Sequence, residues 1–252
     1  QGNYGRAEGH SLYDFYMRDY VGVDPADGLA MWKVFYIDAD GNGAFTPGEQ
    51  ITSLTQYLAD NPDVNPADVR EGTTKTYAQA TQHYVGKSAF PDVRGAFMLD
   101  AGYKGFTISA QFLYQIGGYG YDGAYARLMS NDAIGGNNWH KDIFNRWQEP
   151  GDITDVPRLS NDYDANTNGT STRFLTKTDF LALNNVRIGY DFPKSIVENI
   201  GMNQLSIFVS GDNLWLLTER DGFNPSTHIA GSSDMYRYSP LTSITGGVRI
   251  NF

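Results

Sequence analysis

Alternation of apolar and polar side chains with a period of two is the clearest pattern in this chain. It is most regular over Phe106–Ile116, where Thr107, Ser109 and Gln111 separate the apolar positions. Successive side chains of a strand point to opposite faces, so the pattern predicts a β-strand with one apolar face. The segment is about as long as the 9–11 residues that a tilted strand needs to cross a bilayer. The same alternation, less regular, predicts further strands at Leu12–Val23, Leu29–Ile37, Gly95–Tyr103, Phe180–Tyr190, Leu205–Ser210 and Ser243–Phe252.

The connections between the predicted strands alternate between short and long. An up-and-down transmembrane barrel has this arrangement, with short turns at the periplasmic rim and long extracellular loops. We therefore expect an all-β fold, a transmembrane antiparallel β-barrel. The short connections are Asp24–Gly28, Lys104–Gly105 and Asp191–Gln204, and the long, polar ones are Asp38–Val93, Gly117–Thr176 and Trp215–Thr242.

The predicted strands, about seven in number, do not close a barrel by themselves. Bacterial single-chain barrels have an even number of strands, and an open sheet edge cannot face lipid. We therefore expect residues 1–252 to be the C-terminal portion of one larger barrel domain. Its two open edges are expected at Leu12–Val23 and Ser243–Phe252, and Gln1–His10 is expected in an extracellular loop.

The last ten residues end the chain on an amphipathic strand. Thr245, Gly247, Ile250 and Phe252 follow the order polar, glycine, apolar, aromatic. This order resembles the C-terminal assembly signal of bacterial outer-membrane β-barrels. It supports the barrel interpretation that the alternation of side chains already favours.

Strand phase predicts which side chains face lipid. Ile108 and Phe112 are expected on the lipid face, whereas Arg187 and Arg249 are expected on the lumen face. In the strand Phe180–Tyr190, regular alternation predicts one shared apolar face. Its expected members are Phe180, Ala182, Val186, Ile188 and Tyr190.

Composition agrees with a barrel but would mislead a search for membrane helices. Mean hydropathy is −0.43, and no apolar run reaches the ~18 residues of a spanning helix. Alternating strands average to neutral hydropathy, so this result does not argue against a barrel. The net charge of −10 argues against nucleic acid as a partner. The absence of cysteine excludes disulfides and cysteine-ligated zinc.

Several segments together resemble the SusC/RagA family of TonB-dependent outer-membrane transporters. The resemblance extends over nearly the whole chain, in order and spacing, and ends with a proline before a strand that closes on Asn-Phe. The segments are Phe35–Gly43, Pro91–Gly95, Tyr103–Phe106, Trp139–Asp142 with Arg146-Trp147, Asn185–Pro193 and Leu205–Leu214.

This resemblance implies a 22-stranded barrel plugged by an N-terminal domain. It implies uptake of oligosaccharides or peptides, driven by TonB, with a SusD-type surface lipoprotein as partner. The expected location is the outer membrane of a Gram-negative, Bacteroidetes-like bacterium. The plug, the remaining N-terminal strands and the segment that contacts TonB would then belong to the rest of the same barrel protein.

A calcium-loop motif lies in the first long connection. Asp38–Glu49 matches the 12-residue EF-hand loop, whose oxygen ligands surround one hard cation. Flanking helices are not expected, because Leu29–Ile37 has the pattern of a strand. A tight Asp/Asn/Gly turn without metal is the alternative. The expected ligands are the side chains of Asp38, Asp40, Asn42 and Glu49 and the carbonyl of Ala44.

Aromatic side chains in the long connections are candidates for substrate binding. Flat rings stack on sugars, and neighbouring Asp and Asn side chains bond hydroxyl groups. The alternative is that each ring packs a loop or belongs to the interfacial girdle, and we favour this alternative for any single residue. The candidates are Tyr119, Tyr121, Trp139, Trp147 and Trp215.

No catalytic motif or organic cofactor site is predicted. The four histidines are scattered without a metal-binding spacing, and the acids Asp152, Asp155, Asp162 and Asp164 are expected to be a solvated loop. We therefore expect a transporter rather than an enzyme. A non-transporting outer-membrane barrel or adhesin and a soluble calcium-binding β-domain remain the alternatives.

Overall fold

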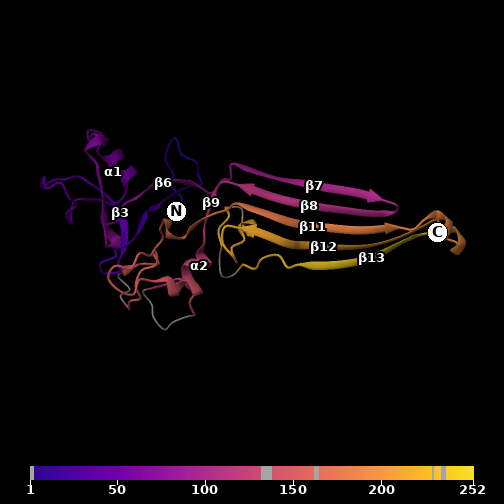
Figure 1. Cartoon of the computed structure of the whole chain (residues 1–252). Helices are drawn as coiled ribbons and strands as arrows, with labels where there is room; N and C mark the ends of the chain where they lie inside the picture. Colours follow the sequence, from indigo (N-terminus) through magenta and orange to yellow (C-terminus); the bar gives the residue numbers. More distant parts are fainter. Residues whose placement is uncertain (1–2, 132–137, 162–164, 229, 234–236) are drawn as a thin grey trace. The chain divides into compact units, whose positions relative to one another are not determined.

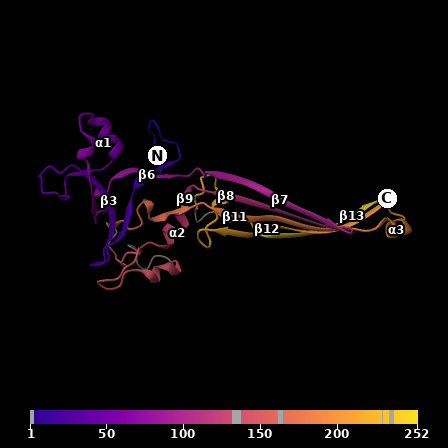
Figure 2. The ribbon, with the colours of Figure 1, turned by 45° about the horizontal axis from the view of Figure 1, so that its top comes forward.

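The longest strands of the chain form one five-stranded antiparallel sheet, in the order β13-β12-β11-β8-β7. The computed structural model describes residues 3–131, 138–161, 165–228, 230–233 and 237–252. Figures 1 and 2 show the five strands side by side in a single layer. The strands are β7 (Val93–Tyr103), β8 (Phe106–Ile116), β11 (Phe180–Asp191), β12 (Gln204–Thr218) and β13 (Ser243–Asn251).

The described chain divides into two compact units. Unit 1 consists of Gln1–Ala89 and Tyr121–Leu175, and unit 2 consists of Phe90–Gly120 and Thr176–Phe252. The five-stranded sheet belongs entirely to unit 2. That residues 1–252 form one portion of a single barrel domain stays a prediction. The short strands β9 (Tyr119–Tyr121) and β10 (Leu175–Lys177) lie at two of the points where the chain passes between units.

Two of the three predicted short connections lie at one end of the sheet, whereas the third, Asp24–Gly28, joins β2 to β3 in unit 1. Lys104 and Gly105 both have positive φ, of 48° and 87°, so they form the tight turn between β7 and β8. Helices α3 (Lys194–Val197) and η6 (Glu198–Ile200) join β11 to β12 at the same end, where the C-terminus also lies (Figure 1). The long connection from β12 to β13 starts at the other end and contains η7 (Pro225–Thr227).

Unit 1 is built from short strands and single-turn helices. Strand β1 (Asp14–Arg18) pairs with β6 (Gln82–Ser88), and β3 (Ala30–Tyr36) pairs with its three sheet neighbours. Those neighbours are β2 (Tyr20–Val23), β4 (Gln50–Ile51) and β5 (Arg70–Thr74). The helices are α1 (Leu54–Asp60), η1 (Pro66–Asp68), η2 (Tyr77–Gln79), α2 (Gly123–Leu128), η3 (Lys141–Asn145) and η5 (Thr172–Phe174).

The prediction of seven spanning strands is wrong for two of them. The segments Leu12–Val23 and Leu29–Ile37 form β1, β2 and β3 of unit 1 and do not join the five-stranded sheet. Their strands have 5, 4 and 7 residues, fewer than the ~9–11 that span a bilayer. Their apolar faces pack inside unit 1. An open sheet edge at Leu12–Val23 is therefore wrong as well, and β7 takes that place.

The core of unit 1 explains this misassignment. In β3, Ala30, Trp32, Val34 and Tyr36 are all buried, and the residues between them are half-buried. Trp32 packs with Ala30 and Ala80, and partly buried tyrosines close the cluster. Alternation therefore predicts a strand with one apolar face, and that face can pack against lipid or against other parts of the protein.

A β-bulge in β11 reverses the faces of its first residues. Leu183 pairs with Phe112 of β8, and Asn185 pairs with the next residue, Gln111, so Asn184 is an extra residue in the strand. Phe180 and Ala182 consequently share a face with Gln115 and Leu113. The prediction that they share the face of Val186, Ile188 and Tyr190 is wrong.

Candidate functional site

The five-stranded sheet has one apolar face. Ile108 of β8 lies opposite Ala101 of β7 and Ile188 of β11, and Ile188 lies opposite Val209 of β12. Residues paired across a sheet point to the same side. Ile188 and Val209 are 50% and 55% exposed, so this row needs an apolar medium against it. Phe112 continues the same face and stacks on Phe97, with ring centroids 4.9 Å apart.

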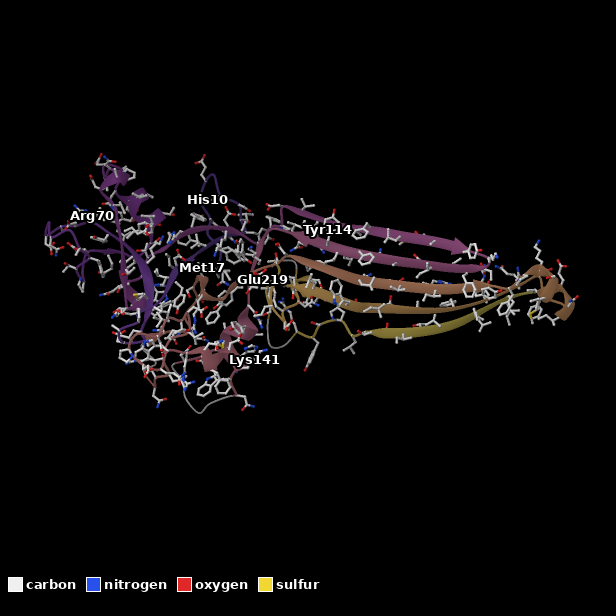
Figure 3. The ribbon with its side chains drawn as sticks, in the orientation of Figure 1. His10, Met17, Arg70, Tyr114, Lys141 and Glu219 are labelled. Atoms are coloured by element: carbon white, nitrogen blue, oxygen red, sulfur yellow. The ribbon has the colours of Figure 1, made fainter. Side chains whose placement is uncertain are left out.

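The opposite face of the sheet is polar. Arg187 of β11 lies opposite Ser109 of β8 and Ser210 of β12, and Ser109 lies opposite Asp100. Further along β12, two same-face positions from Ser210, Ser206 pairs with Arg249. Arg187 and Arg249 therefore lie on the face opposite Ile108 and Phe112, as the strand phase predicts. Figure 3 shows side chains projecting from both faces of the sheet, including Tyr114.

The predicted calcium loop is the connection of a β-hairpin. Tyr36 of β3 pairs with Gln50 of β4, and the segment between them contains Asp38–Glu49. No helix flanks the loop in the described chain, in agreement with the sequence prediction. The hairpin fixes both ends of the loop, which places its first and last acidic residues near each other.

Three carboxylates converge in this loop. Asp38, Asp40 and Glu49 each offer one oxygen atom, and these atoms lie within 4.8 Å of one another. Backbone N–H groups hold the Glu49 carboxylate, because Ala39 N donates to Oε1 at 2.8 Å and Thr46 N donates to Oε2 at 3.0 Å. The carboxylate of Asp40 accepts bonds from Asn42 at 2.8 Å and from Thr46 at 3.1 Å.

The Asp38 carboxylate is the buried member of the group. Its side chain is 5% exposed, and its Oδ1 atom has no hydrogen-bond partner. Its Oδ2 atom accepts a bond from Gly43 N and forms an ion pair with Arg70 Nη1 at 2.7 Å. Arg70 belongs to β5, which is remote in sequence, and Figure 3 labels it in unit 1. Sequence spacing gave no signal for this partner.

The other two expected ligands, Asn42 and the Ala44 carbonyl, are not among the three converging carboxylates. The Oδ1 atom of Asn42 accepts a bond from Ala44 N at 2.7 Å, which makes a turn inside the loop. Ligation by Asn42 and by the Ala44 carbonyl stays a prediction. The turn shows how the loop brings the two residues beside Asp40.

Two of the aromatic candidates are part of a hydrophobic cluster in unit 1. Tyr121 and Trp139 pack against buried Ala126, Met129, Ile143, Val156 and Phe174. The indole Nε1 of Trp139 donates to the Ser130 carbonyl at 2.9 Å. Burial raises the pKa of Tyr121 to about 12. The structure therefore uses both rings for packing, and their role in substrate binding stays a prediction.

Trp147 covers a tight turn in unit 1. Its indole Nε1 donates to the Pro25 carbonyl at 3.0 Å, and its ring lies against Gly28. Gly28 has a φ of 73°, and a Cβ atom there would overlap the ring. Both properties explain why glycine ends the predicted Asp24–Gly28 turn.

The remaining two candidates belong to unit 2. Trp215 lies within β12, where it pairs with Leu183 on the face of Phe112. It is 48% exposed, a position typical of an interfacial aromatic girdle. Tyr119 is half-buried in β9. Neither arrangement tests sugar stacking, which stays a prediction for both rings.

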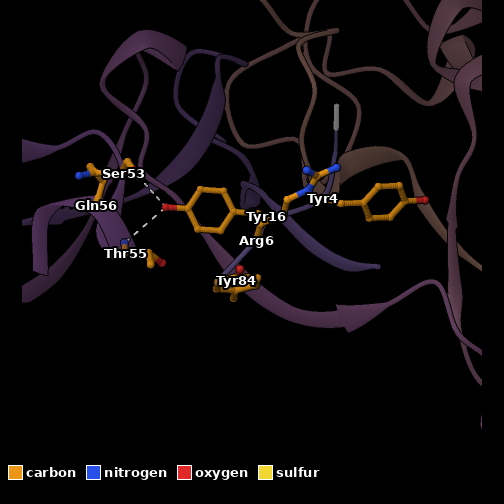
Figure 4. A pocket seen from close by; sticks show the side chains of 8 residues that line it. Tyr4, Arg6, Tyr16, Ser53, Thr55, Gln56 and Tyr84 are labelled. Carbon is orange, nitrogen blue, oxygen red and sulfur yellow. Dashed lines mark hydrogen bonds between the residues drawn. The ribbon is translucent and has the colours of Figure 1, made fainter. Parts of the chain in front are cut away.

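A small tyrosine-lined pocket in unit 1 has no counterpart in the sequence predictions (Figure 4). The hydroxyl of Tyr16 bonds Ser53 Oγ at 2.7 Å and accepts a bond from Thr55 N. The cavity is about 170 Å³, below the ~300–1,000 Å³ of typical ligand sites. It is too small for an oligosaccharide or a peptide. Its walls are Tyr4, Gly5, Arg6, Tyr16, Ser53, Thr55, Gln56 and Tyr84.

The acidic loop and the histidines form no further cluster in the described part of the chain. Asp152 caps a turn by accepting bonds from Gln148 N and Glu149 N, and these bonds lower its pKa. Asp162 and Asp164 lie outside the described residues. Among the described helices, none is long and apolar enough to cross a membrane.

Two curated proteins of Formosa agariphila are similar to this chain in sequence. TonB-dependent receptor P39 is 30% identical over 168 residues, and TonB-dependent receptor P3 is 28% identical over 172 residues. Each match includes 64% of this chain but 16% of the receptor. The chain thus spans a small part of its relatives' length. No family model matches it.

Solved structures share the fold. The structure of the RagAB peptide transporter matches 95% of this chain and 23% of its own, with a TM-score of 0.65 and 24% identity. The RagAB peptide importer in its "closed-closed" state matches the same shares, with a TM-score of 0.67 and 23% identity. The "open-open" state gives 0.63 and 23% over 95% of this chain.

The similarities to solved structures, together with the sheet that is apolar on one face and polar on the other, identify the fold. The fold is all-β, and unit 2 is a wall segment of a transmembrane antiparallel β-barrel. The chain is similar to TonB-dependent receptors in sequence and to the RagAB structures in fold, which confirms the resemblance to the SusC/RagA family seen in the sequence. The matched proteins are named as TonB-dependent receptors and as a peptide transporter or importer.

Proposed function

We propose that this chain is part of an outer-membrane nutrient importer of the SusC type. The observation that carries the proposal is the five-stranded sheet, apolar through Ile108 and Ile188 on one face and polar through Arg187 on the other. A wall of this kind separates lipid from a wet lumen. The similarity to TonB-dependent receptors supports energy coupling through TonB, by parts of the longer protein.

The substrate is an oligosaccharide or a peptide that enters with a SusD-type surface lipoprotein. Solved structures with this fold are named peptide transporters and importers, which supports peptides. The aromatic residues of the long connections fit either class, because rings stack on sugars and on peptide side chains alike. The relatives are named receptors and the structures transporters, which supports transport without catalysis.

Purification of the native complex tests this function. The full-length protein, tagged at a chromosomal copy, should require detergent and should co-purify with a surface lipoprotein. Intact mass and N-terminal sequencing then identify each component. A protein that leaves the cell envelope without detergent would contradict the barrel. A detergent-dependent protein without plug domain or lipoprotein would instead favour an adhesin or structural barrel.

Uptake separates the two substrate classes. A deletion strain is complemented with the full-length gene and grown on peptides or on polysaccharides as the limiting nutrient. Growth restored on one class alone identifies that class as the substrate. Equal growth of the deletion strain and the complemented strain on both classes would contradict nutrient import.

A further inference from the structure

We propose that the Asp38–Glu49 hairpin loop binds one Ca²⁺ ion and that Arg70 competes with the ion for the Asp38 carboxylate. The proposal concerns unit 1 alone and does not depend on which nutrient is transported. It goes beyond the sequence motif, because Arg70 comes from β5 and is no part of the loop. Its support comes from the burial of Asp38, the charges of the three carboxylates and the position of the Arg70 side chain.

Burial marks Asp38 as an incomplete ligand. Its side chain is 5% exposed, and its Oδ1 atom is buried without a hydrogen-bond partner. A buried carboxylate oxygen normally has a partner, because leaving it unpaired costs its full desolvation. This carboxylate is one of the three that converge within 4.8 Å. A cation between the three would give Oδ1 the missing partner.

Charge points in the same direction. Among the described residues, Arg70 is the one cation paired with the group, and it pairs with Asp38 alone. Asp40 and Glu49 therefore have no ion-pair partner in the described chain. Carboxylates this close repel one another unless a cation lies between them. A divalent ion neutralises the two charges that Arg70 leaves.

The type of donor favours calcium over magnesium. All the converging atoms are carboxylate oxygens of one loop, and the Glu49 carboxylate is oriented by backbone N–H groups at both oxygens. Calcium accepts six to eight oxygens in irregular geometry, with a bidentate carboxylate at the last loop position. Magnesium demands a near-ideal octahedron and keeps several waters.

The reach of Arg70 makes it a competitor. Its Nη1 atom lies 2.7 Å from Asp38 Oδ2, and a Cβ atom on Gly43 would lie 3.8 Å from the same nitrogen. Its side chain is half-exposed, so it can turn into solvent without disturbing β5. When Ca²⁺ binds, the guanidinium has to release Asp38 or share its oxygens with a like charge. Arg70 thus lowers the affinity of the loop.

Terbium luminescence and calorimetry on the full-length transporter in detergent test this site. After removal of divalent ions with a chelator, Ca²⁺ is titrated by calorimetry, and Tb³⁺ emission is excited through tyrosine. We expect binding in the range of extracellular calcium modules, about 10⁻⁴–10⁻³ M. Magnesium at equal concentration should not displace Tb³⁺.

Three variants separate the ligand from the competitor. Asp38→Asn should weaken calcium binding at least tenfold, and Arg70→Gln should strengthen it at least threefold. Asp63→Asn removes an exposed charge outside the loop and serves as the matched control, with no expected change. Unchanged affinity in Asp38→Asn would refute the site. If Asp38→Asn misfolds, Arg70→Gln still tests the proposal, because it removes no calcium ligand. Unchanged or weaker calcium binding in Arg70→Gln would refute the competition.

Discussion

The ring of Phe208 in β12 lies against the backbone of Gly247, its directly opposite partner in β13. A Cβ atom on residue 247 would overlap ring atoms of Phe208. The guanidinium of Arg187 lies over the same ring, 3.9 Å from its centroid. Because Gly247 has no side chain, the Phe208 ring can lie against its backbone on the polar face.

Gly247→Ala should destabilise the barrel of the full-length transporter. The added methyl group forces Phe208 out of its place, at a cost typical of overpacking, about 1–3 kcal/mol. The measurement is thermal unfolding in detergent. Gly246→Ala is the control, because a Cβ atom there meets the Phe208 carbonyl at an ordinary 4.0 Å. Phe208→Ala combined with Gly247→Ala should lose the penalty of the glycine change, and additive losses would contradict this contact.

Ile108→Arg should impair assembly far more than Gln111→Arg. Ile108 faces lipid with Ile188, where an arginine near the bilayer midplane costs roughly 2–4 kcal/mol. Gln111 lies on the polar face, where its side chain accepts a bond from Asn184 at 3.0 Å. The readout is the amount of folded transporter in outer-membrane fractions. Equal amounts of the two variants would mean that the faces are reversed or that neither faces lipid.

Unit 1 should lose stability as the pH falls through the ordinary range of histidine. Burial lowers the pKa of His83, against the opposing effects of the Tyr84 carbonyl, Asp19 and Glu71, and Lys33 adds to the lowering. Its Nδ1 atom lies 3.0 Å from that carbonyl, and its buried Nε2 atom has no partner. The neutral ring is favoured in the folded state.

The sign of this effect follows from proton linkage. Between the lowered folded pKa and the ordinary histidine pKa of 6.5 in the unfolded state, the unfolded state binds more protons. The free energy of unfolding therefore falls as the pH decreases from about 6.5 towards the folded pKa. Hydrogen exchange of the β6 backbone, measured from pH 7.5 to 5, should show this loss. His83→Gln should remove this loss of stability, whereas Lys87→Gln on the same strand should not. A pH effect that persists in His83→Gln would show that another group causes it.

The 252 residues expressed alone should not form a closed barrel. Within the described chain, β7 and β13 are the outer strands of the five-stranded sheet, with one neighbour each. Each unpaired backbone group in lipid costs several kcal/mol, and a row of them exceeds the ~5–15 kcal/mol of a typical domain. Refolding into detergent should therefore yield no heat-modifiable band on a gel. A folded, heat-modifiable monomer would show that this chain closes without further strands.

Strands β7 and β8 are the part of the fold that the sequence predicts best. Phe106–Ile116 alternates except at Leu113, and Lys104–Gly105 marks the turn, so the bounds of β8 and the register of the pair follow from local rules. β7 begins at Val93, two residues before the predicted Gly95. β1 and β3 could not be separated from spanning strands in this way. Phe15 and Trp32 belong to short segments with an apolar residue at every second position, as in a lipid-facing strand, but protein covers them. Period two does not distinguish the two environments.

The candidate site was likewise predicted only in part from the sequence. The spacing of Asp38, Asp40 and Glu49 predicted that their carboxylates converge, because all three lie in one loop. Arg70 was beyond prediction, since its contact with Asp38 depends on the pairing of β5 with β3. Composition likewise identified aromatic rings in the connections, but only packing shows that Trp139 lies against the unit 1 core.

The extra residue Asn184 has a consequence for how the gene can change. In most strands a single-codon deletion exchanges inside and outside for every residue beyond it. Here deletion of Asn184 would restore a regular strand, and Phe180 and Ala182 would keep their present place on the polar face. The hydrogen bonds of Asn184 to Gln111 and of Asn185 to Asp212 fasten the irregular point on both sides. Descendants of this sequence should therefore tolerate the loss of one residue at this point more readily than the loss of one residue elsewhere in β11.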